Sequence, residues 1–318
     1  CAKRRLPRVG AKAIRRRQHM KILLLGKNGQ VGWELQRSLA PLGQLLALDR
    51  HSTVACGDLS RPDELAQTVR DHRPHVIVNA AAHTAVDRAE TEHELAVVLN
   101  ATAPEALAKA AREVGAWLVH YSTDYVFNGE GTTPWRESDI TAPLNVYGRT
   151  KQDGEIAIVH SGCQHLIFRT SWVYASRGGN FAKTMLRLAQ ERDRLTVIND
   201  QWGAPTGADL IADVTAQALV HALQGRATSG IYHLVAAGHT SWHGYASHVI
   251  DTARRLQHST EWRVQEVAPV PSSAFVTAAR RPHNSRMDTT KLQETFGLTL
   301  PSWQQGVDRM LAEILTTA

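Results

Sequence analysis

The sequence predicts an α/β protein built on a doubly wound parallel sheet, followed by a smaller mixed α/β domain. Over the first half of the chain, apolar strands such as ILLLG and HVIVNAAA alternate with helical segments. These strands are continuous apolar runs, which are typical of parallel strands covered by helices on both faces. A turn through three glycines also joins the first strand to the first helix.

Five strands are predicted, at residues 21–26, 45–49, 75–82, 117–123 and 165–174. Helices are expected between them, with Ser60 as the cap of the second helix. An alanine-rich helical region ends near Gly115 and precedes the fourth strand. Another helix begins around Tyr147, after a loop that contains Asn128-Gly129 and Pro134.

Composition narrows the class of protein. Of the 318 residues, 43% are apolar and 21% are charged, as in globular proteins. The longest apolar runs fall short of the roughly 20 residues that span a bilayer, so no membrane insertion is expected. Cys1, Cys56 and Cys163 lack CxxC spacing. They indicate a reducing, cytoplasmic location without a disulfide framework.

The net charge of +6 is confined to one end of the chain. Residues 1–19 hold eight of the 36 basic residues and no acid, so the remainder carries 28 bases against 30 acids. We therefore predict a disordered basic extension at 1–19 and a nearly neutral body. An arm for nucleic acid is the alternative for this segment, but the body gives no reason to expect nucleic-acid binding.

The glycine turn has the features of a dinucleotide-binding loop. In GKNGQVG, Gly26, Gly29 and Gly32 follow a strand and lead into a helix. Glycines allow a tight turn and let backbone amides approach a pyrophosphate at the positive helix end. Asp49 ends the second strand 20 residues after Gly29, where a carboxylate can hold the adenosine ribose. The alternative is a plain strand–turn–helix with a surface aspartate.

Cofactor preference stays open at this level. Asp49 favours NADH, because a carboxylate repels the 2′-phosphate of NADPH. Arg50 and His51 follow directly and offer positive charge to that phosphate. Asp58 and Leu59 are candidates to flank the adenine, although Asp58 is equally a candidate helix cap.

The regular alternation of strands and helices ends near residue 175. Beyond it, the chain contains more Trp, Pro and loops. We therefore predict a Rossmann-type dinucleotide-binding domain at residues 20–175. Residues 176–318 are expected to form mainly a substrate-binding domain, with some segments interleaved.

Three further residues indicate carbonyl reduction. A tyrosine and a lysine lie one helical turn apart in NVYGRTK, Tyr147 and Lys151. A phenol titrates near 10, and a nearby lysine cation favours its ionised form, so the pair can exchange a proton with a substrate oxygen. Thr123, at the end of the fourth strand, can hydrogen bond the same oxygen as charge develops. Each residue alone is common, but their order after a dinucleotide loop is much less so.

The order GxxGxxG, NAAA, STD and YxxxK resembles the extended short-chain dehydrogenases/reductases. Within that superfamily, GKNGQVGWEL, NAAAHTAVDRAE, HYSTDYVFNG, PLNVYGRTKQDGE, FRTSWVY, NDQWGAPTGADL and RPHNSRMD resemble the dTDP-4-dehydrorhamnose reductases. The resemblance extends from residue 20 to about residue 315.

This resemblance implies hydride transfer from NADH or NADPH to C4 of dTDP-4-dehydro-L-rhamnose, the last step of dTDP-L-rhamnose synthesis, with lipopolysaccharide O-antigen as one destination. It implies Tyr147 as proton donor, Lys151 as its partner and Thr123 as oxyanion stabiliser. The residues implied at the cofactor are Gly26, Gly29, Gln30, Val31, Gly32, Asp49, Asp58, Leu59, Ala82, His83, Thr84, Tyr121 and Lys151. Those implied at the dTDP-sugar are Thr123, Asp124, Tyr147, Trp172, Arg281 and Arg286.

Physical chemistry supports the last two assignments, because arginine binds a diphosphate through two parallel hydrogen bonds. Trp202, in the NDQWGAPT segment, offers an aromatic surface. The resemblance also implies a homodimer with Mg²⁺ at acidic interface residues, for which Glu34, Asp209 and Glu313 are the candidates. The aspartate has the shorter reach, which weakens the expectation for metal.

Two other functions compete with this interpretation. A related 4,6-dehydratase would carry Glu after Thr-Asp, but Tyr125 follows Asp124 here. A related epimerase is harder to exclude, although its SWVY and NDQWGAPT segments would differ. The second alternative is a cofactor-binding regulatory protein without catalysis, like the regulatory β-subunit of methionine adenosyltransferase. Its departures from the family fall at the STD and SWVY segments, which are intact in this sequence.

Overall fold

A parallel six-stranded sheet forms the centre of the larger domain. The computed structural model describes residues 20–316, so the predicted extension at 1–19 lies outside the described residues. The strands run in the order β10-β5-β4-β3-β1-β2, and every neighbouring pair is parallel. Their bounds are β1 Lys21–Leu25, β2 Gln44–Leu48, β3 Val76–Asn79, β4 Trp117–Thr123, β5 Gln164–Thr170 and β10 Gly230–His233.

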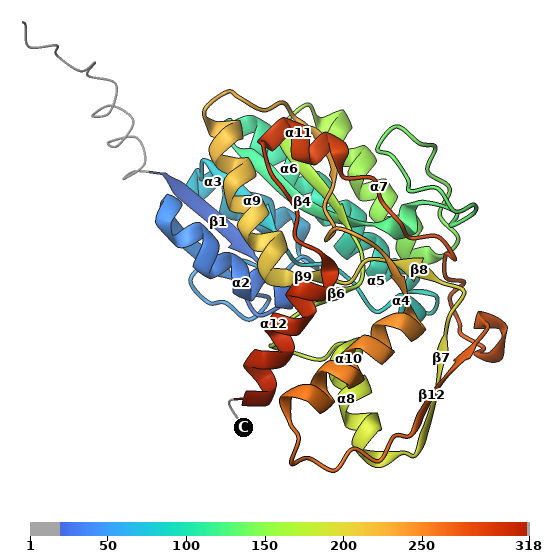
Figure 1. Ribbon diagram of the computed structural model, residues 1–318. Coiled ribbons are helices and arrows are strands. Elements are labelled where there is room, and N and C mark those ends of the chain that lie inside the picture. The colour runs from blue at the N-terminus through green and yellow to red at the C-terminus, as the bar shows by residue number, and fades with distance from the viewer. Residues whose placement is uncertain (1–19, 317–318) are drawn as a thin grey trace, which may run out of the picture.

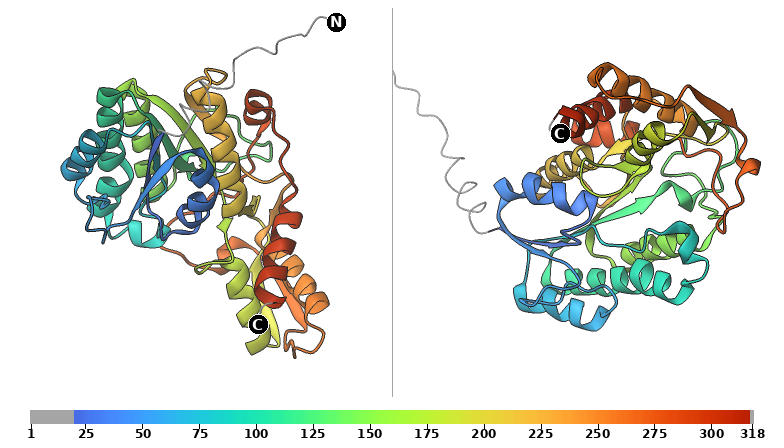
Figure 2. Two further views of the ribbon diagram at one scale, coloured as in Figure 1. Left: turned by 90° about the vertical axis from the view of Figure 1, so that its left-hand side faces the viewer. Right: turned by 90° about the horizontal axis from the view of Figure 1, so that it is seen from below.

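Alternate residues of each strand supply the two faces of this sheet. In β1, Ile22 and Leu24 belong to one core, whereas Leu23 and Leu25 belong to the other. Helices cover both faces (Figures 1 and 2). The first core includes α2 (Gln30–Leu39), α9 (Ala208–Leu223) and α11 (Thr290–Phe296). The second includes α3 (Pro62–His72), α6 (Ala103–Val114) and α7 (Val146–Ser161). Burial on both faces explains the continuous apolar runs in the sequence.

The topology places a ligand site at one edge of the sheet. β1 lies between β2 and β3, so the chain turns to opposite sides after β1 and after β3. Ligands of doubly wound folds bind at the carboxyl ends of the strands where the order reverses. The glycine loop follows β1, and Ala80-Ala81-Ala82 follows β3, so both line this position.

The smaller domain packs helices on a short parallel strand pair. Figure 1 shows α8 and α10 below the larger sheet, beside β7 and β12, with α12 on the other side of α10. An aromatic core that includes Tyr174, Tyr245 and Trp303 joins the helices. The bounds are α8 Phe181–Glu191, β7 Arg194–Ile198, α10 Trp242–Leu256, β12 Glu266–Val270 and α12 Trp303–Thr316.

Two small strand pairs connect the domains. β6 (Val173–Tyr174) pairs with β9 (Thr206–Gly207), and β8 (Trp202–Gly203) pairs with β11 (Thr240–Ser241). The short helical turns are 3₁₀ turns at Ala40–Leu42, Asp124–Val126 and Ser272–Ala274, α-helical turns α4 (Val86–Ala89) and α5 (His93–Val97), and a π-helical turn at Val98–Thr102. Because α9, β10 and α11 return to the large sheet, segments after residue 176 contribute to both domains.

Two local expectations were wrong. The strand expected at 165–174 is divided, because Trp172 has a φ of 48° that interrupts extended backbone between β5 and β6. Ser60 does not cap the second helix: its hydroxyl donates to Asp58, and α3 begins after Arg61 with proline at the first turn. No helix in the described part of the chain is long and apolar enough to cross a membrane.

Candidate active site

The glycine loop packs so closely against other backbone segments that side chains would not fit at two of its glycines. Gly26 has a φ of +83°, and a Cβ there would lie 2.8 Å from the Ala81 nitrogen. A Cβ on Gly32 would lie 2.0 Å from the Gly26 carbonyl oxygen. Gly29 is the N-cap of α2 and provides no side-chain cap, so the first amides of the helix lack a side-chain acceptor. The turn is therefore built to receive an anion such as a pyrophosphate. Gln30 and Val31 begin this helix.

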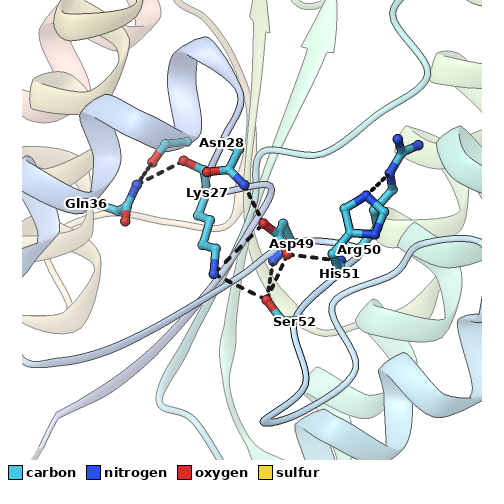
Figure 3. A network of polar contacts seen from close by, with 8 residues as sticks. Lys27, Asn28, Gln36, Asp49, Arg50, His51 and Ser52 are labelled. Atoms are coloured by element: carbon cyan, nitrogen blue, oxygen red, sulfur yellow. Dashed lines mark hydrogen bonds and ion pairs between the residues drawn. The ribbon is translucent and has the colours of Figure 1, made fainter.

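Asp49 is the centre of a polar network just after β2 (Figure 3). Its Oδ1 accepts hydrogen bonds from the Ser52 hydroxyl at 2.9 Å and from the His51 amide at 3.0 Å, while Asn28 donates to Oδ2. The Lys27 ammonium lies 3.9 Å from Oδ2. Burial acts to raise the pKa of Asp49, but the Ser52 and His51 hydrogen bonds outweigh it and lower the pKa. The carboxylate is thus held ionised beside the Lys27 ammonium. The Arg50 side chain contacts the His51 imidazole and points away from Asp49 (Figure 3).

The loop after β3 is held by a residue that the sequence did not single out. The Asn100 side chain accepts from the His83 amide at 2.8 Å and donates to the His83 carbonyl at 3.1 Å. Asn100 also donates to Thr150 on α7 and lies in the π-helical turn. The only signal was a lone asparagine in an alanine-rich helical region. This contact fixes the Ala82-His83-Thr84 segment against the helix that carries Tyr147 and Lys151.

Tyr147 and Thr123 meet where β4 ends and α7 begins. Asn145 caps α7 by accepting from the Gly148 amide at 2.8 Å, which places Tyr147 in the first turn. Burial raises the pKa of the Tyr147 phenol to about 12, and a hydrogen bond with Thr123 opposes this rise. Thr123 is 5% exposed. The predicted proton donor and oxyanion stabiliser are therefore brought together.

Lys151 is buried one turn after Tyr147. Its ammonium group donates to the Tyr121 carbonyl oxygen at 2.5 Å, and its Nζ lies 3.1 Å from Nε2 of His120. Burial lowers the pKa of Lys151 to about 8, against the raising effect of Glu155. His120 is a second residue that sequence reasoning missed. Its position in an apolar strand gave no signal beyond a polar residue facing inward.

Asp124 lies beside the tyrosine and is 2% exposed. Burial raises its pKa to about 6, although hydrogen bonds from Ser285 and Thr123 oppose the shift. Its Oδ2 has no hydrogen-bond partner among the described residues. A buried acceptor without a partner is expensive, so a substrate hydroxyl group is a natural partner for it.

Four of the predicted contacts involve the second half of the chain. Trp172 stacks on Trp242 with ring centroids 3.6 Å apart. Arg281 donates to both carboxylate oxygens of Asp87, so an acid occupies its guanidinium fork. The Arg286 guanidinium lies over the Trp202 ring, 4.8 Å from its centroid. Arg286 and Trp202 are therefore together, whereas Arg281 is already engaged.

Three other predicted cofactor residues have side-chain contacts within the chain. The Tyr121 phenol contacts Thr215 of α9 on the far face of the sheet, so only its carbonyl reaches Lys151. Asp58 accepts from the amide and hydroxyl of Ser60. Leu59 is buried in the second core.

The three acids predicted to bind metal do not form a cluster within residues 20–316. Glu34 pairs with Arg37, and Asp209 pairs with Arg309 at 2.9 Å, so two of the three acids face guanidinium groups. Glu313 does not form a metal-binding group with Glu34 or Asp209. Among residues 20–316, no cluster of three or more His, Cys, Asp and Glu side chains is placed to hold a metal ion. The Mg²⁺ site was expected where two chains meet, so it stays a prediction.

The parallel sheet, the glycine loop and the Thr-Tyr-Lys group together define an extended short-chain dehydrogenase/reductase. The family model described as the RmlD substrate binding domain matches residues 20–316. The dTDP-4-dehydrorhamnose reductase of Shigella flexneri is 62% identical over 298 residues, which cover 94% of this chain and 99% of that protein. The Escherichia coli K12 protein of the same name is 61% identical with the same coverage. The chain belongs to the dTDP-4-dehydrorhamnose reductase family.

Solved structures agree with this assignment. The dTDP-4-dehydrorhamnose reductase of Bacillus anthracis in complex with NADP has a TM-score of 0.83 and 34% identity, covering 93% of this chain and all of that one. The UDP-glucose 4-epimerase of Thermus thermophilus in complex with NAD has a TM-score of 0.74 at 19% identity, covering 94% of this chain and 100% of that one. The second likeness concerns the fold alone.

Proposed function

We propose that this protein reduces the C4 ketone of dTDP-4-dehydro-L-rhamnose to the alcohol of dTDP-L-rhamnose, with NADH or NADPH as the reductant. The observation that carries the proposal is the meeting of Thr123, Tyr147 and Lys151 at the sheet edge where the glycine loop also lies. The names of the relatives at 61–62% identity supply the substrate.

The side chains divide the work on the carbonyl oxygen. Tyr147 donates its phenolic proton to that oxygen, and the Thr123 hydroxyl hydrogen bonds it as negative charge develops. Lys151 lies one turn away on the same helix, where its charge stabilises the phenolate that remains. Asp124, with its Oδ2 free to accept, orients a sugar hydroxyl.

A nicotinamide cofactor, when bound, supplies the hydride for the ketone carbon. The residues that suit it are the Gly26, Gly29 and Gly32 turn at the start of α2 for the pyrophosphate, and Asp49 for the adenosine ribose. Lys27 lies next to the Asp49 carboxylate and offers charge to a 2′-phosphate. Arg50, the next residue in the chain, is proposed as a second cation that would turn toward that phosphate. This supports use of both NADH and NADPH.

The dTDP group is expected near Arg286 and Trp202. The guanidinium lies over the indole ring, so a planar base and a diphosphate have an aromatic surface and a cation side by side. Arg281 is proposed as a second contact with the diphosphate. To make that contact, its guanidinium must release Asp87. Trp172 is proposed at the sugar.

We also propose that the protein works as a homodimer in the cytoplasm. The free thiols Cys56 and Cys163 support a reducing compartment, and the dimer is expected from the family resemblance. Light scattering on the purified protein measures the mass directly. A mass equal to one chain at working concentration would refute the dimer.

The test is nicotinamide oxidation with dTDP-4-dehydro-L-rhamnose generated by upstream enzymes. Turnover should require this substrate and fall at least about a thousandfold in Tyr147→Phe, because the transferable proton is lost. Tyr232→Phe is the matched control, since this buried tyrosine of β10 donates to the Thr228 carbonyl, away from the site. Cofactor binding without turnover would favour the regulatory role instead, and conversion to an epimer without net oxidation would favour an epimerase.

A further inference from the structure

Behind Lys151 lies a buried chain of three side chains from three elements. Asn79 ends β3, His120 lies in β4 and Lys151 lies in α7. The Asn79 Nδ2 is 3.2 Å from His120 Nδ1, and His120 Nε2 is 3.1 Å from Lys151 Nζ. Each of the three residues is 1% exposed. Because these side chains are hidden from bulk water, each hydrogen-bond donor among them must face an acceptor of a neighbouring group.

The orientation of the Asn79 amide decides the tautomer of His120. The Ala81 backbone N–H donates to Asn79 Oδ1 at 3.2 Å, so the oxygen faces the chain after β3 and the NH₂ group faces the imidazole. His120 Nδ1 is then an acceptor. Burial, followed by the charge of Lys151, lowers the pKa of His120 well below its ordinary value. A neutral imidazole that accepts at Nδ1 carries its one proton on Nε2.

This proton points at Lys151. An imidazole N–H can donate to the lone pair of a neutral amine, but it repels an ammonium group. The other charged group facing Lys151 is Glu155, one turn further along α7, and the Arg169 guanidinium from β5 pairs with it at 2.6 Å. Tyr147 precedes Lys151 by one turn on the same helix. Burial and the His120 N–H therefore both favour the neutral amine, while Glu155 favours the ammonium.

We propose that Asn79 and His120 act as a tautomer lock that makes Lys151 a ready proton donor to Tyr147. The inference rests on the proposed function. After Tyr147 has given its proton to the substrate oxygen, an N–H bond of the Lys151 ammonium breaks and an O–H bond forms on the phenolate. The amine that remains accepts a hydrogen bond from His120 Nε2–H, and it later regains a proton from solvent. His120 and Asn79 are positioning residues, since they act through Lys151.

The first experiment reads the tautomer and needs no turnover. Protein labelled with nitrogen-15 histidine gives imidazole spectra in which Nδ1–H, Nε2–H and imidazolium forms differ, and His120→Gln identifies the His120 signals. The neutral Nε2–H form is expected from pH 6 to 9. An Nδ1–H tautomer or an imidazolium would overturn the proposal. Because this readout is independent of substrate, it also stands if the proposed reaction is wrong.

The second experiment moves the His120 proton from Nε2 to Nδ1. In Asn79→Asp a carboxylate accepts from Nδ1–H, which moves the proton away from Nε2 and lets Nε2 accept from the ammonium. The imidazole spectrum should switch to the Nδ1–H tautomer, and the alkaline limb of kcat/KM should move up by about one pH unit, because the pKa of Lys151 rises. An unchanged tautomer or a limb that moves down would refute the proposal.

Asn145→Asp is the matched control for added charge. It also replaces a buried asparagine with an acid near α7, but at the N-cap, where aspartate is an accepted cap. The control should keep the Nε2–H tautomer of His120. A switch in this variant would show that any nearby carboxylate moves the proton, and the specific role of Asn79 would fall.

Discussion

The Thr123 hydroxyl donates a hydrogen bond to the neighbouring carboxylate, Asp124. The Thr123 oxygen lies 3.0 Å from Asp124 Oδ1. It also accepts from the Tyr125 amide at 3.2 Å. The threonine hydroxyl therefore has a carboxylate as its acceptor before substrate arrives, and its proton must turn from Asp124 to the substrate oxygen as charge develops there.

This geometry predicts the effect of removing the threonine hydroxyl. Thr123→Val keeps the shape of the side chain but removes the hydrogen bond to the developing oxyanion, so kcat should fall about a hundredfold. Thr123→Ser should recover most of the rate, since it restores the hydroxyl. Steady-state kinetics on both variants check this. A valine variant with near wild-type kcat would exclude Thr123 from the chemistry.

Asp124 should make the stability of the protein depend on pH. Its pKa is about 6 in the folded protein and about 3.9 when unfolded, so the folded state favours the protonated carboxyl. The resulting stabilisation is present below pH 4 and lost as the pH rises through 6, and it amounts to about 3 kcal/mol. Relative to Asp124→Asn, the wild type should therefore lose stability between pH 4 and 6.

Urea unfolding of both proteins at pH 4.5 and pH 7.5 measures this difference, because all other titrating groups are shared. The asparagine variant should be the more stable protein at pH 7.5. A constant difference between the two proteins over this range would contradict the raised pKa.

Cofactor preference should respond in opposite directions to two neighbouring substitutions. Asp49→Asn removes the charge that repels a 2′-phosphate, so the ratio of kcat/KM for NADPH over NADH should rise about tenfold. Arg50→Gln removes an attracting charge and should lower the same ratio. Initial rates with each cofactor give both ratios. A change of the same sign in both variants would show that neither residue faces the 2′ position.

The buried ion pair of Glu155 and Arg169 should contribute to stability only when both residues are present. Arg169 donates to both carboxylate oxygens, at 2.9 and 2.6 Å, and both side chains are 3–4% exposed. Arg169→Met leaves an unpaired buried charge and should cost about 3–5 kcal/mol in the free energy of unfolding.

The double variant Arg169→Met, Glu155→Leu should regain most of that loss, since it removes the orphaned carboxylate as well. Urea unfolding of the single and double variants completes the cycle. If the two losses simply added, the pair would not be coupled.

Much of this protein follows from local sequence. The apolar runs of β1, β3, β4 and β5 predicted a parallel sheet, because a strand buried on both faces needs apolar residues at every position. The glycine loop and the Tyr147–Lys151 spacing are also local, since a turn and a helix fix them within a few residues. The class of the fold and the proposed reaction could therefore be inferred before any contact was known.

Only the tertiary structure decided which distant groups complete the site. Asn100 reaches His83, Asp87 occupies Arg281, and His120 meets Lys151 across 31 residues of chain. No periodicity encodes such pairs, because hydrogen-bond partners that are far apart in sequence depend on how strands and helices pack. The sequence determined that a tyrosine and a lysine share one helical face; packing against β4 determined that the lysine is buried and the tyrosine partly buried, and burial sets how readily each holds its proton.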